Sequence, residues 1–390
     1  MEQVDPEEHY YKLNRFLLSV SGLWPYQNEW SARLMRAIIT FMMLTSTIFQ
    51  LASMFTSDLT LDFIVDLIPL VLLTLGTLGN LFSRVLHIDK LRELFDNIWK
   101  DWALQKTHDE IKIMHERAKV TRLFTLCYFI LIYISIGIYN VWMFVPEILN
   151  IISPLNESRP RRRPFQVEFF IDEERYFFLV RSHICLSIII VPIVYLAGAT
   201  LFLALAQHIC GMCELLGYRA ERLFCIKDEG CNLIKGSKVT RGNIAVLIRL
   251  HYNIIQFVDI LQIYHTMPFV MDLIGTVILL SMTLSQILNI SGIERAIRSI
   301  GIAVVSLCYI FIYNYMGQKV TDLTSDISNR MYNSRWYNAV VSDQKTLLII
   351  MMRRCQPLFL TACKFYVMSL QNFGMILQTT ISYCMFIRQI

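Results

Sequence analysis

The chain has 390 residues, of which 55% are hydrophobic and 17% are charged, with a formal net charge of +5 and a positive mean hydropathy. A soluble domain cannot bury this much apolar mass, so the composition excludes a soluble protein and indicates an integral membrane protein. A bilayer core is about 30 Å thick and needs roughly 20 apolar residues per helix, which the long apolar runs of this chain provide.

The first 30 residues combine acidic residues with scattered apolar ones. No basic stretch leads into an apolar core there, so we expect no cleavable signal peptide. Seven later runs are long and apolar enough to be transmembrane helices. We place them at residues 35–56, 63–82, 124–145, 184–207, 268–290, 297–317 and 363–390. The sequence therefore predicts an all-α membrane protein with seven transmembrane helices in a single domain.

The distribution of Lys and Arg predicts the orientation. Cytoplasmic loops retain positive charge, and most of the 36 Lys and Arg fall on one side of the membrane if the amino terminus is inside. We therefore expect a cytoplasmic N-terminus and an extracellular C-terminus. The basic residues 159–163 lie in the predicted outer loop, which is long enough for the charge rule to weaken. That loop also carries the sequon Asn156-Glu157-Ser158, which makes Asn156 a predicted glycosylation site.

Several other classes of protein lack support in the sequence. The predicted orientation is inverted relative to a G-protein-coupled receptor, and the Asp/Glu-Arg-Tyr and Asn-Pro-x-x-Tyr motifs of that class are missing. No hydrolase, metalloprotease or phosphate-loop motif occurs, so we expect no enzyme. Cys210 and Cys213 have the spacing of a zinc knuckle, but Cys225 and Cys231 are spaced wrongly for its second half. We expect no metal, cofactor or nucleic-acid partner.

The last predicted helix, from Phe365 to Ile387, has a polar side. At 100° per residue, four polar residues fall within about 20° of one direction. They are Gln371, Gln378, Ser382 and Gln389. Two interpretations remain open: the stripe lines a pore, or it joins helices within one subunit. Phe386 and Ile390, one turn apart at the outer end, resemble a hydrophobic constriction that gates by dewetting.

Two segments resemble insect chemoreceptors. The ending Ser382-Tyr383, five residues and Gln389-Ile390 is similar to the Thr-Tyr and Gln-Phe signature that closes those proteins. Residues 332–337, Tyr-Asn-Ser-Arg-Trp-Tyr, and the amphipathic residues 343–354 resemble the segment before the seventh helix of insect odorant receptors. The resemblance extends over the whole chain in length, number of spans, topology and loop sizes. It points to the insect odorant receptor family and its channel fold.

The resemblance implies a subunit of a tetrameric, ligand-gated, non-selective cation channel in the plasma membrane of a sensory-neuron dendrite. It divides the chain into a six-helix ligand-binding bundle (residues 1–317), a cytoplasmic anchor (318–362) and a pore-lining helix (363–390). Phe386 and Ile390 then occupy gate positions, and Gln389 matches a pore glutamine. The second cytoplasmic loop lacks the large insertion of the shared odorant receptor co-receptor (Orco). The resemblance therefore implies a tuning subunit that assembles with that co-receptor.

The family's odorant pocket lies in the outer half of the second, third, fourth and sixth helices. In this chain that selects Leu67, Leu70, Tyr133, Gly137, Ile138, Val141, Trp142, Ile188, Val191, Tyr195, Ile300 and Val304. Their aromatic and aliphatic chemistry predicts a volatile, mostly apolar ligand. The alternative is that each of these residues packs in the core of the helix bundle and does not contact a ligand.

Two alternatives to an odorant receptor remain. A gustatory receptor of the same superfamily keeps the terminal Thr-Tyr and Gln-Phe more strictly and works without the co-receptor. A membrane transporter would show broken, Gly- or Pro-interrupted spans in paired halves, and the sequence shows no internal repeat.

Overall fold

The computed structural model describes residues 10–104, 106–153, 168–172, 175–223, 237–289, 293–334, 336–352 and 358–389. Nearly all of this is helical. The elements in chain order are α2 (Lys12–Val20), α3 (Glu29–Thr56), α4 (Leu61–Leu86), α5 (Ile88–Ala103), α6 (His108–Met143), α7 (Val145–Ile152), α8 (Phe177–Arg222), α9 (Ser237–Leu288), α10 (Ile293–Tyr332), the 3₁₀ turn η1 (Trp336–Asn338), α11 (Val341–Met352), β1 (Thr361–Ala362), β2 (Tyr366–Val367) and α12 (Leu370–Gln389).

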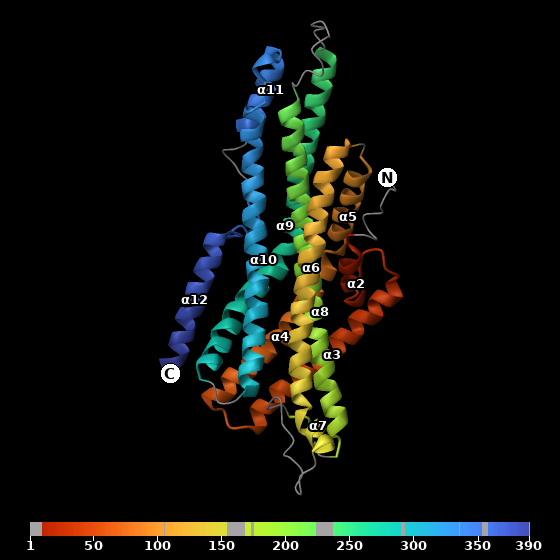
Figure 1. The fold of residues 1–390 in the computed structure, drawn as a ribbon. Helices are drawn as coiled ribbons and strands as arrows, with labels where there is room; N and C mark the ends of the chain where they lie inside the picture. Colours follow the sequence, from red (N-terminus) through yellow and green to blue (C-terminus); the bar gives the residue numbers. More distant parts are fainter. Residues whose placement is uncertain are drawn as a thin grey trace.

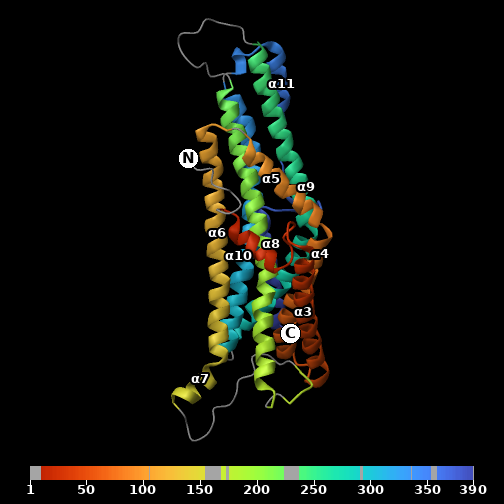
Figure 2. The same ribbon diagram turned by 90° about the vertical axis from the view of Figure 1, so that its right-hand side faces the viewer.

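The long helices form one elongated bundle. Helix α7 lies at one end and α11 lies at the other, and α12 lies on the flank of the bundle beside α9 and α10 (Figures 1 and 2). The predicted orientation assigns the α7 end to the outside and the α11 end to the cytoplasm.

Six helices among the described residues are long and apolar enough to cross a membrane: α3, α4, α6, α8, α9 and α10. They confirm the first six predicted spans apart from two boundaries. The fifth span was expected to continue to Ile290, but α9 ends at Leu288. The third span was expected to continue to Val145, but α6 ends at Met143 and α7 begins at Val145 with Pro146 in its first turn. Helices α8 and α9 have 46 and 52 residues. At 1.5 Å per residue they are more than twice as long as a bilayer core is thick, so both continue beyond it.

The predicted start of the seventh helix, at residue 363 or 365, is wrong. Thr361–Ala362 instead pairs in antiparallel fashion with Tyr366–Val367. Cys363 and Lys364, with φ of 50° and 63°, form the left-handed turn between these strands. The chain becomes helical only at Leu370, and α12 has 20 residues, still enough to span a bilayer core. Its most apolar stretch is less apolar than those of the six helices named above.

A buried amide explains why the helix begins late. Asn314 of α10 is fully buried, and its side-chain oxygen accepts hydrogen bonds from the Tyr366 hydroxyl (2.7 Å) and the Ser369 backbone N–H (3.1 Å). The Ser369 hydroxyl in turn accepts from the Asn372 N–H at 3.2 Å, as a helix cap does. These bonds satisfy backbone groups of the hairpin and the first turn of α12. These tertiary hydrogen bonds outweigh local helix propensity, so the helix begins only after them.

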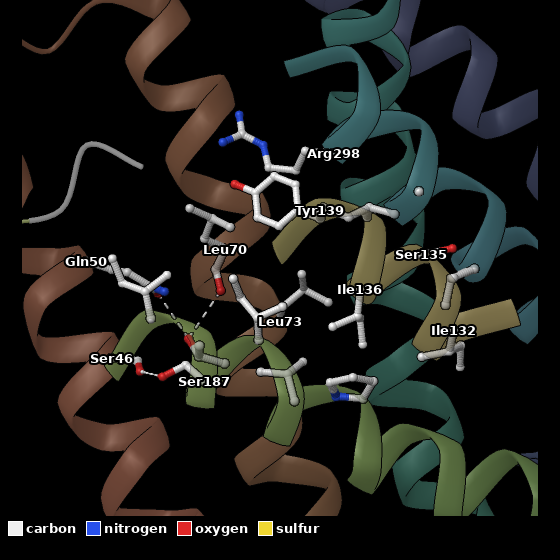
Figure 3. A pocket seen from close by; sticks show the side chains of 18 of the residues that line it. Ser46, Gln50, Leu70, Leu73, Ile132, Ser135, Ile136, Tyr139, Ser187 and Arg298 are labelled. Carbon is white, nitrogen blue, oxygen red and sulfur yellow. Dashed lines mark hydrogen bonds between the residues drawn. The ribbon is translucent and has the colours of Figure 1, made fainter. Parts of the chain in front are cut away.

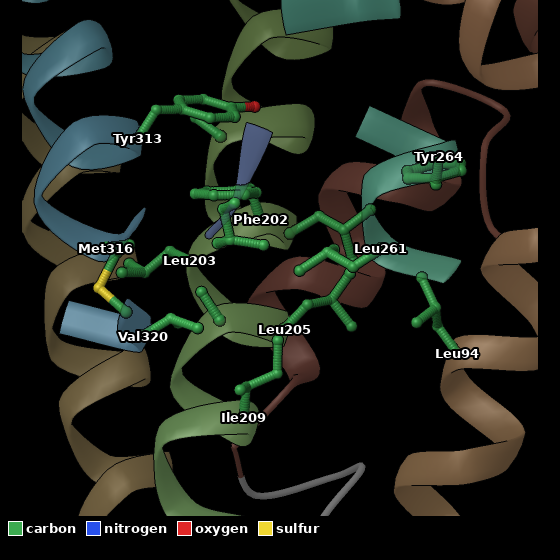
Figure 4. Close-up of a cluster of buried hydrophobic side chains, with 14 of the residues drawn as sticks. Leu94, Phe202, Leu203, Leu205, Ile209, Leu261, Tyr264, Tyr313, Met316 and Val320 are labelled. Carbon is green, nitrogen blue, oxygen red and sulfur yellow. The ribbon is translucent and has the colours of Figure 1, made fainter. Parts of the chain in front are cut away.

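Helix α8 is the centre of the bundle. From Val194 to Ala220 nearly every side chain is buried, because α2, α3, α4, α6, α9 and α10 all pack against it. Figure 4 shows Phe202 and Leu205 of α8 between Tyr313 of α10 and Leu261 of α9. The Phe202 and Tyr313 rings stack with centroids 4.2 Å apart. A helix segment that is apolar on all sides, as this part of α8 is, is typically buried among other helices.

Polar side chains also connect the helices in the core. Asp272 of α9 accepts hydrogen bonds from Asn80 of α4 and from the Tyr309 hydroxyl of α10. The Arg84 guanidinium is buried nearby, with its carbon 5.8 Å from the Tyr264 ring centroid. Three helices therefore meet at one carboxylate.

The close approach of α10 to the start of α12 gives a testable prediction. A Cβ atom at Gly317 would overlap the backbone carbonyl of Met368, just before α12. We expect Gly317→Ala to displace the hairpin and lower the melting temperature of the detergent-solubilised protein, since such overpacking costs about 1–3 kcal/mol. Gly275→Ala is the matched control, because a Cβ there meets no atom within 4 Å. A Gly317→Ala protein as stable as the control would show that this contact is unimportant.

Candidate functional site: a cavity between five helices

A cavity of about 230 Å³ lies between α3, α4, α6, α8 and α10, toward the α7 end of the bundle. Figure 3 shows side chains of these helices converging on it. The lining residues are Ser46, Phe49, Gln50, Leu70, Leu73, Thr74, Ile132, Ser135, Ile136, Tyr139, Phe169, His183, Ile184, Ser187, Ile188, Val191, Pro192, Ile297, Arg298, Gly301, Ile302, Val305 and Ser306.

The outer segment 168–172 supplies one part of the wall. Its Phe169 is buried, and the ring lies 4.7 Å from that of Phe49 and 5.9 Å from that of His183, measured between centroids. The Glu168 N–H also donates to the Phe49 carbonyl at 3.4 Å. These contacts fix Phe169 against α3 and α8, so a residue from outside the helices contributes to the cavity.

Hydrogen bonds join the polar side chains on the α3, α4 and α8 side. The hydroxyl oxygens of Ser46 and Ser187 lie 2.7 Å apart, and the Thr74 hydroxyl donates to the Gln50 side-chain oxygen at 3.2 Å (Figure 3). The Thr45 hydroxyl lies 2.9 Å from Nε2 of His183. Lipid offers no hydrogen-bond partners, so polar side chains in a transmembrane bundle turn inward and bond to one another.

Helices α6 and α10 add apolar wall through Ile132, Ile136, Ile302 and Val305, together with the polar Ser135, Tyr139, Arg298 and Ser306. An apolar cavity of about 150 Å³ is large enough for benzene. A space of about 230 Å³ can therefore hold a somewhat larger organic molecule. The arrangement is suited to binding a small apolar molecule with one polar group, since apolar walls with a few placed polar groups are typical of ligand pockets.

Three of the predicted ligand-binding residues, Leu70, Ile188 and Val191, line the cavity. The other nine do not. Leu67 is buried elsewhere, and Tyr195 packs edge-on against Tyr309, with ring centroids 6.0 Å apart. Tyr133 and Trp142 are half-buried, Gly137 faces open space, and Ile138, Val141, Ile300 and Val304 are exposed on the outside of the bundle.

The face of α6 and α10 that turns inward differs from the predicted one. Both helices are apolar on most sides, so their sequences do not mark the side that meets the cavity. Residues of α3 were missed altogether. A signal did exist, because Ser46, Gln50 and Thr74 are polar residues within apolar spans, and such residues usually face the interior.

Helix α12 presents its polar stripe away from its own chain. It buries Ile376, Thr380 and Cys384, and it packs on α9 and α10. The predicted pore residues Gln371, Gln378, Ser382, Phe386 and Gln389 are all exposed. This argues against the alternative that the stripe joins helices of one subunit. Ile390 and Asn156 lie outside the described residues.

An ion-pair cluster lies between the cavity and the outer end of α12. Asp66 of α4 pairs with Arg295 and Arg298 of α10, each at 3.0 Å, and accepts from the Gln286 amide at 2.9 Å. Arg298 lines the large cavity. On the other side, Asp66 and Arg295 share a pocket of about 90 Å³ with Arg388 of α12. The Asp66 cluster is therefore adjacent both to the large cavity and to the outer end of α12.

The model of the family described as 7tm Odorant receptor matches residues 60–381 of this chain. The chain belongs to the odorant receptor family. This receptor is not an enzyme, and the match favours odorant receptors over the gustatory alternative.

Similar proteins include Odorant receptor 22c of Drosophila melanogaster, 23% identical over 47% of this chain and 46% of that protein. The Odorant receptor coreceptor of Harpegnathos saltator is 21% identical over 40% of this chain and 33% of its own length. The matches thus span between a third and a half of these relatives.

Solved structures show the same fold. The olfactory receptor OR5 from Machilis hrabei in complex with eugenol superimposes with a TM-score of 0.82 at 14% identity, covering 99% of this chain and all of that one. A second structure of OR5 from Machilis hrabei gives a TM-score of 0.80 at 14% identity and covers 97% of each chain. The receptor therefore has the seven-helix insect olfactory receptor fold.

We expect Asp66→Asn to destabilise the outer end of the receptor. Its loss leaves Arg295 and Arg298 without their carboxylate, and breaking a fully buried ion pair costs roughly 3–5 kcal/mol. The Asp66 side chain is 26% exposed, so we expect about half of that cost. The melting temperature of the purified receptor measures the effect. Asp62→Asn, one turn away and exposed, is the control and should change little. Equal loss in both variants would contradict the special role of Asp66.

Proposed function

We propose that this receptor is a tuning subunit of an odorant-gated, non-selective cation channel, and that the cavity between the five helices binds the odorant. The observation that supports this most is the mostly apolar cavity of about 230 Å³ within an odorant receptor fold. The ligand is a volatile, mostly apolar molecule. The receptor acts at the plasma membrane of sensory-neuron dendrites.

The proposed partner is the odorant receptor co-receptor, in a tetramer. The exposed polar stripe of α12 supports this, because Gln371, Gln378 and Ser382 need water or other subunits around them in a membrane. Phe386 is 60% exposed in the single chain and lies at the proposed gate. The chain also lacks the large insertion of the co-receptor in its second cytoplasmic loop, which supports a tuning role.

Recording of ion current tests this proposal. Cells that express the receptor together with the co-receptor should show a cation current when a panel of volatiles is applied, and the current should persist when G-protein signalling is blocked. Cells with the co-receptor alone are the control for receptor-dependent responses. A current that vanishes under the block would contradict a channel. Flux without current would point to a transporter.

Filling the cavity should weaken the ligand response. Ile136 lines the cavity, whereas Ile138, on the same helix, is 55% exposed outside it. We expect Ile136→Trp to lower the potency of every active volatile by at least about tenfold, because the indole occupies the ligand's space and overpacking adds strain. Ile138→Trp should respond normally. Surface labelling confirms that both variants reach the membrane. The reverse pattern would place the odorant elsewhere.

A further inference from the structure

The Ser46 and Ser187 pair in the cavity wall offers hydrogen-bond acceptors and no free donor. The two hydroxyls carry one proton each and lie 2.7 Å apart. Ser46 also lies 2.8 Å from the Met42 carbonyl, and Ser187 lies 2.9 Å from the His183 carbonyl. One proton joins the hydroxyls and the other goes to a carbonyl, so both protons are used while lone pairs remain.

His183 adds a second acceptor to the same wall. Its Nε2 lies 2.9 Å from the Thr45 hydroxyl, which itself lies 3.0 Å from the carbonyls of Phe41 and Met42. When the proton is on Nε2, Thr45 accepts from His183 and donates to a carbonyl. In that tautomer of the neutral ring, Nδ1 is an acceptor. No other described residue forms a hydrogen bond with Nδ1.

Gln50 supplies a donor beside these acceptors. Its side-chain oxygen accepts from Thr74 at 3.2 Å, which fixes the amide so that its two N–H groups are the remaining polar atoms. They have no hydrogen-bond partner within the described part of the chain. Figure 3 shows Gln50, Ser46 and Ser187 on the same side of the cavity. This wall therefore combines several acceptors with one donor group.

We propose that the cavity selects small apolar molecules that carry one hydroxyl group, alcohols or phenols, over molecules whose polar group can only accept. This rests on the proposed function, because the odorant must bind in this cavity. The ligand hydroxyl donates to the serine pair or to Nδ1 of His183 and accepts from Gln50. Its carbon skeleton packs against the Ile132 and Ile136 side. On this wall an ether, ketone or ester can use only the Gln50 amide, and the acceptors stay unpaired.

Matched ligand pairs test this proposal. Cells with the receptor and co-receptor are exposed to aliphatic and aromatic alcohols, each paired with its methyl ether. We expect the alcohols to act at concentrations roughly three- to tenfold lower than their ethers, which is the value of one net hydrogen bond. The double variant Ser46→Ala/Ser187→Ala should bring the ratio of the two potencies closer to one. Ser182→Ala is the matched control on α8, since Ser182 is exposed, bonds to the Leu179 carbonyl at 2.8 Å and does not line the cavity.

His183→Phe is a second variant of similar shape. It removes the ring acceptor together with the hydrogen bond to Thr45, and it should also bring the ratio of alcohol to ether potency closer to one. This variant replaces the double variant in the test if the double variant does not reach the cell surface. Equal potency of alcohols and ethers, or an unchanged ratio in the variants, would overturn this inference and leave the proposed function intact. A receptor at the cell surface that gives no current with any volatile overturns the proposed function and this inference with it.

Discussion

The absence of hydrogen-bond partners in lipid is the constraint on which this structure depends. Each polar side chain within the bundle has to find its partner inside the protein. Asp272 joins α4, α9 and α10 through Asn80 and Tyr309, and Asp66 joins α4 to α9 and α10. These contacts decide which side of each helix turns inward. The polar wall of the cavity is a further result of the same constraint.

Helix α8 explains why the cavity lies where it does. From Val194 to Ala220 nearly every side chain of α8 is buried, and close packing leaves little space beside it. Toward its outer end, residues 185–193 are only half-buried or exposed. The cavity occupies this outer part, between α8 and the surrounding helices, and Phe169 adds a wall from outside the helices. The closely packed core around the inner part of α8 and the cavity beside its outer part therefore both result from how the helices pack against α8.

Helix α12 packs along α9 and α10, and polar groups of the bundle lie near both of its ends. At its start, Asn314 of α10 binds Tyr366 and Ser369. At its outer end, Arg388 shares a small pocket with Asp66, which also pairs with Arg298 in the wall of the large cavity. The ion-pair cluster around Asp66 therefore borders both the large cavity and the outer end of α12.

Composition, run length and local motifs such as Ser382-Tyr383 and Gln389-Ile390 were enough to predict the membrane class, the family and the approximate positions of the first six spans. The sequence also indicated the polar stripe of α12, since a helix repeats at a known angle. Tertiary structure alone decided the late start of α12, where the buried Asn314 amide outweighs helix propensity. It also decided the cavity walls. Helices α6 and α10 are apolar on most sides, so only packing against α8 sets whether Ile136 or Ile138 faces the cavity.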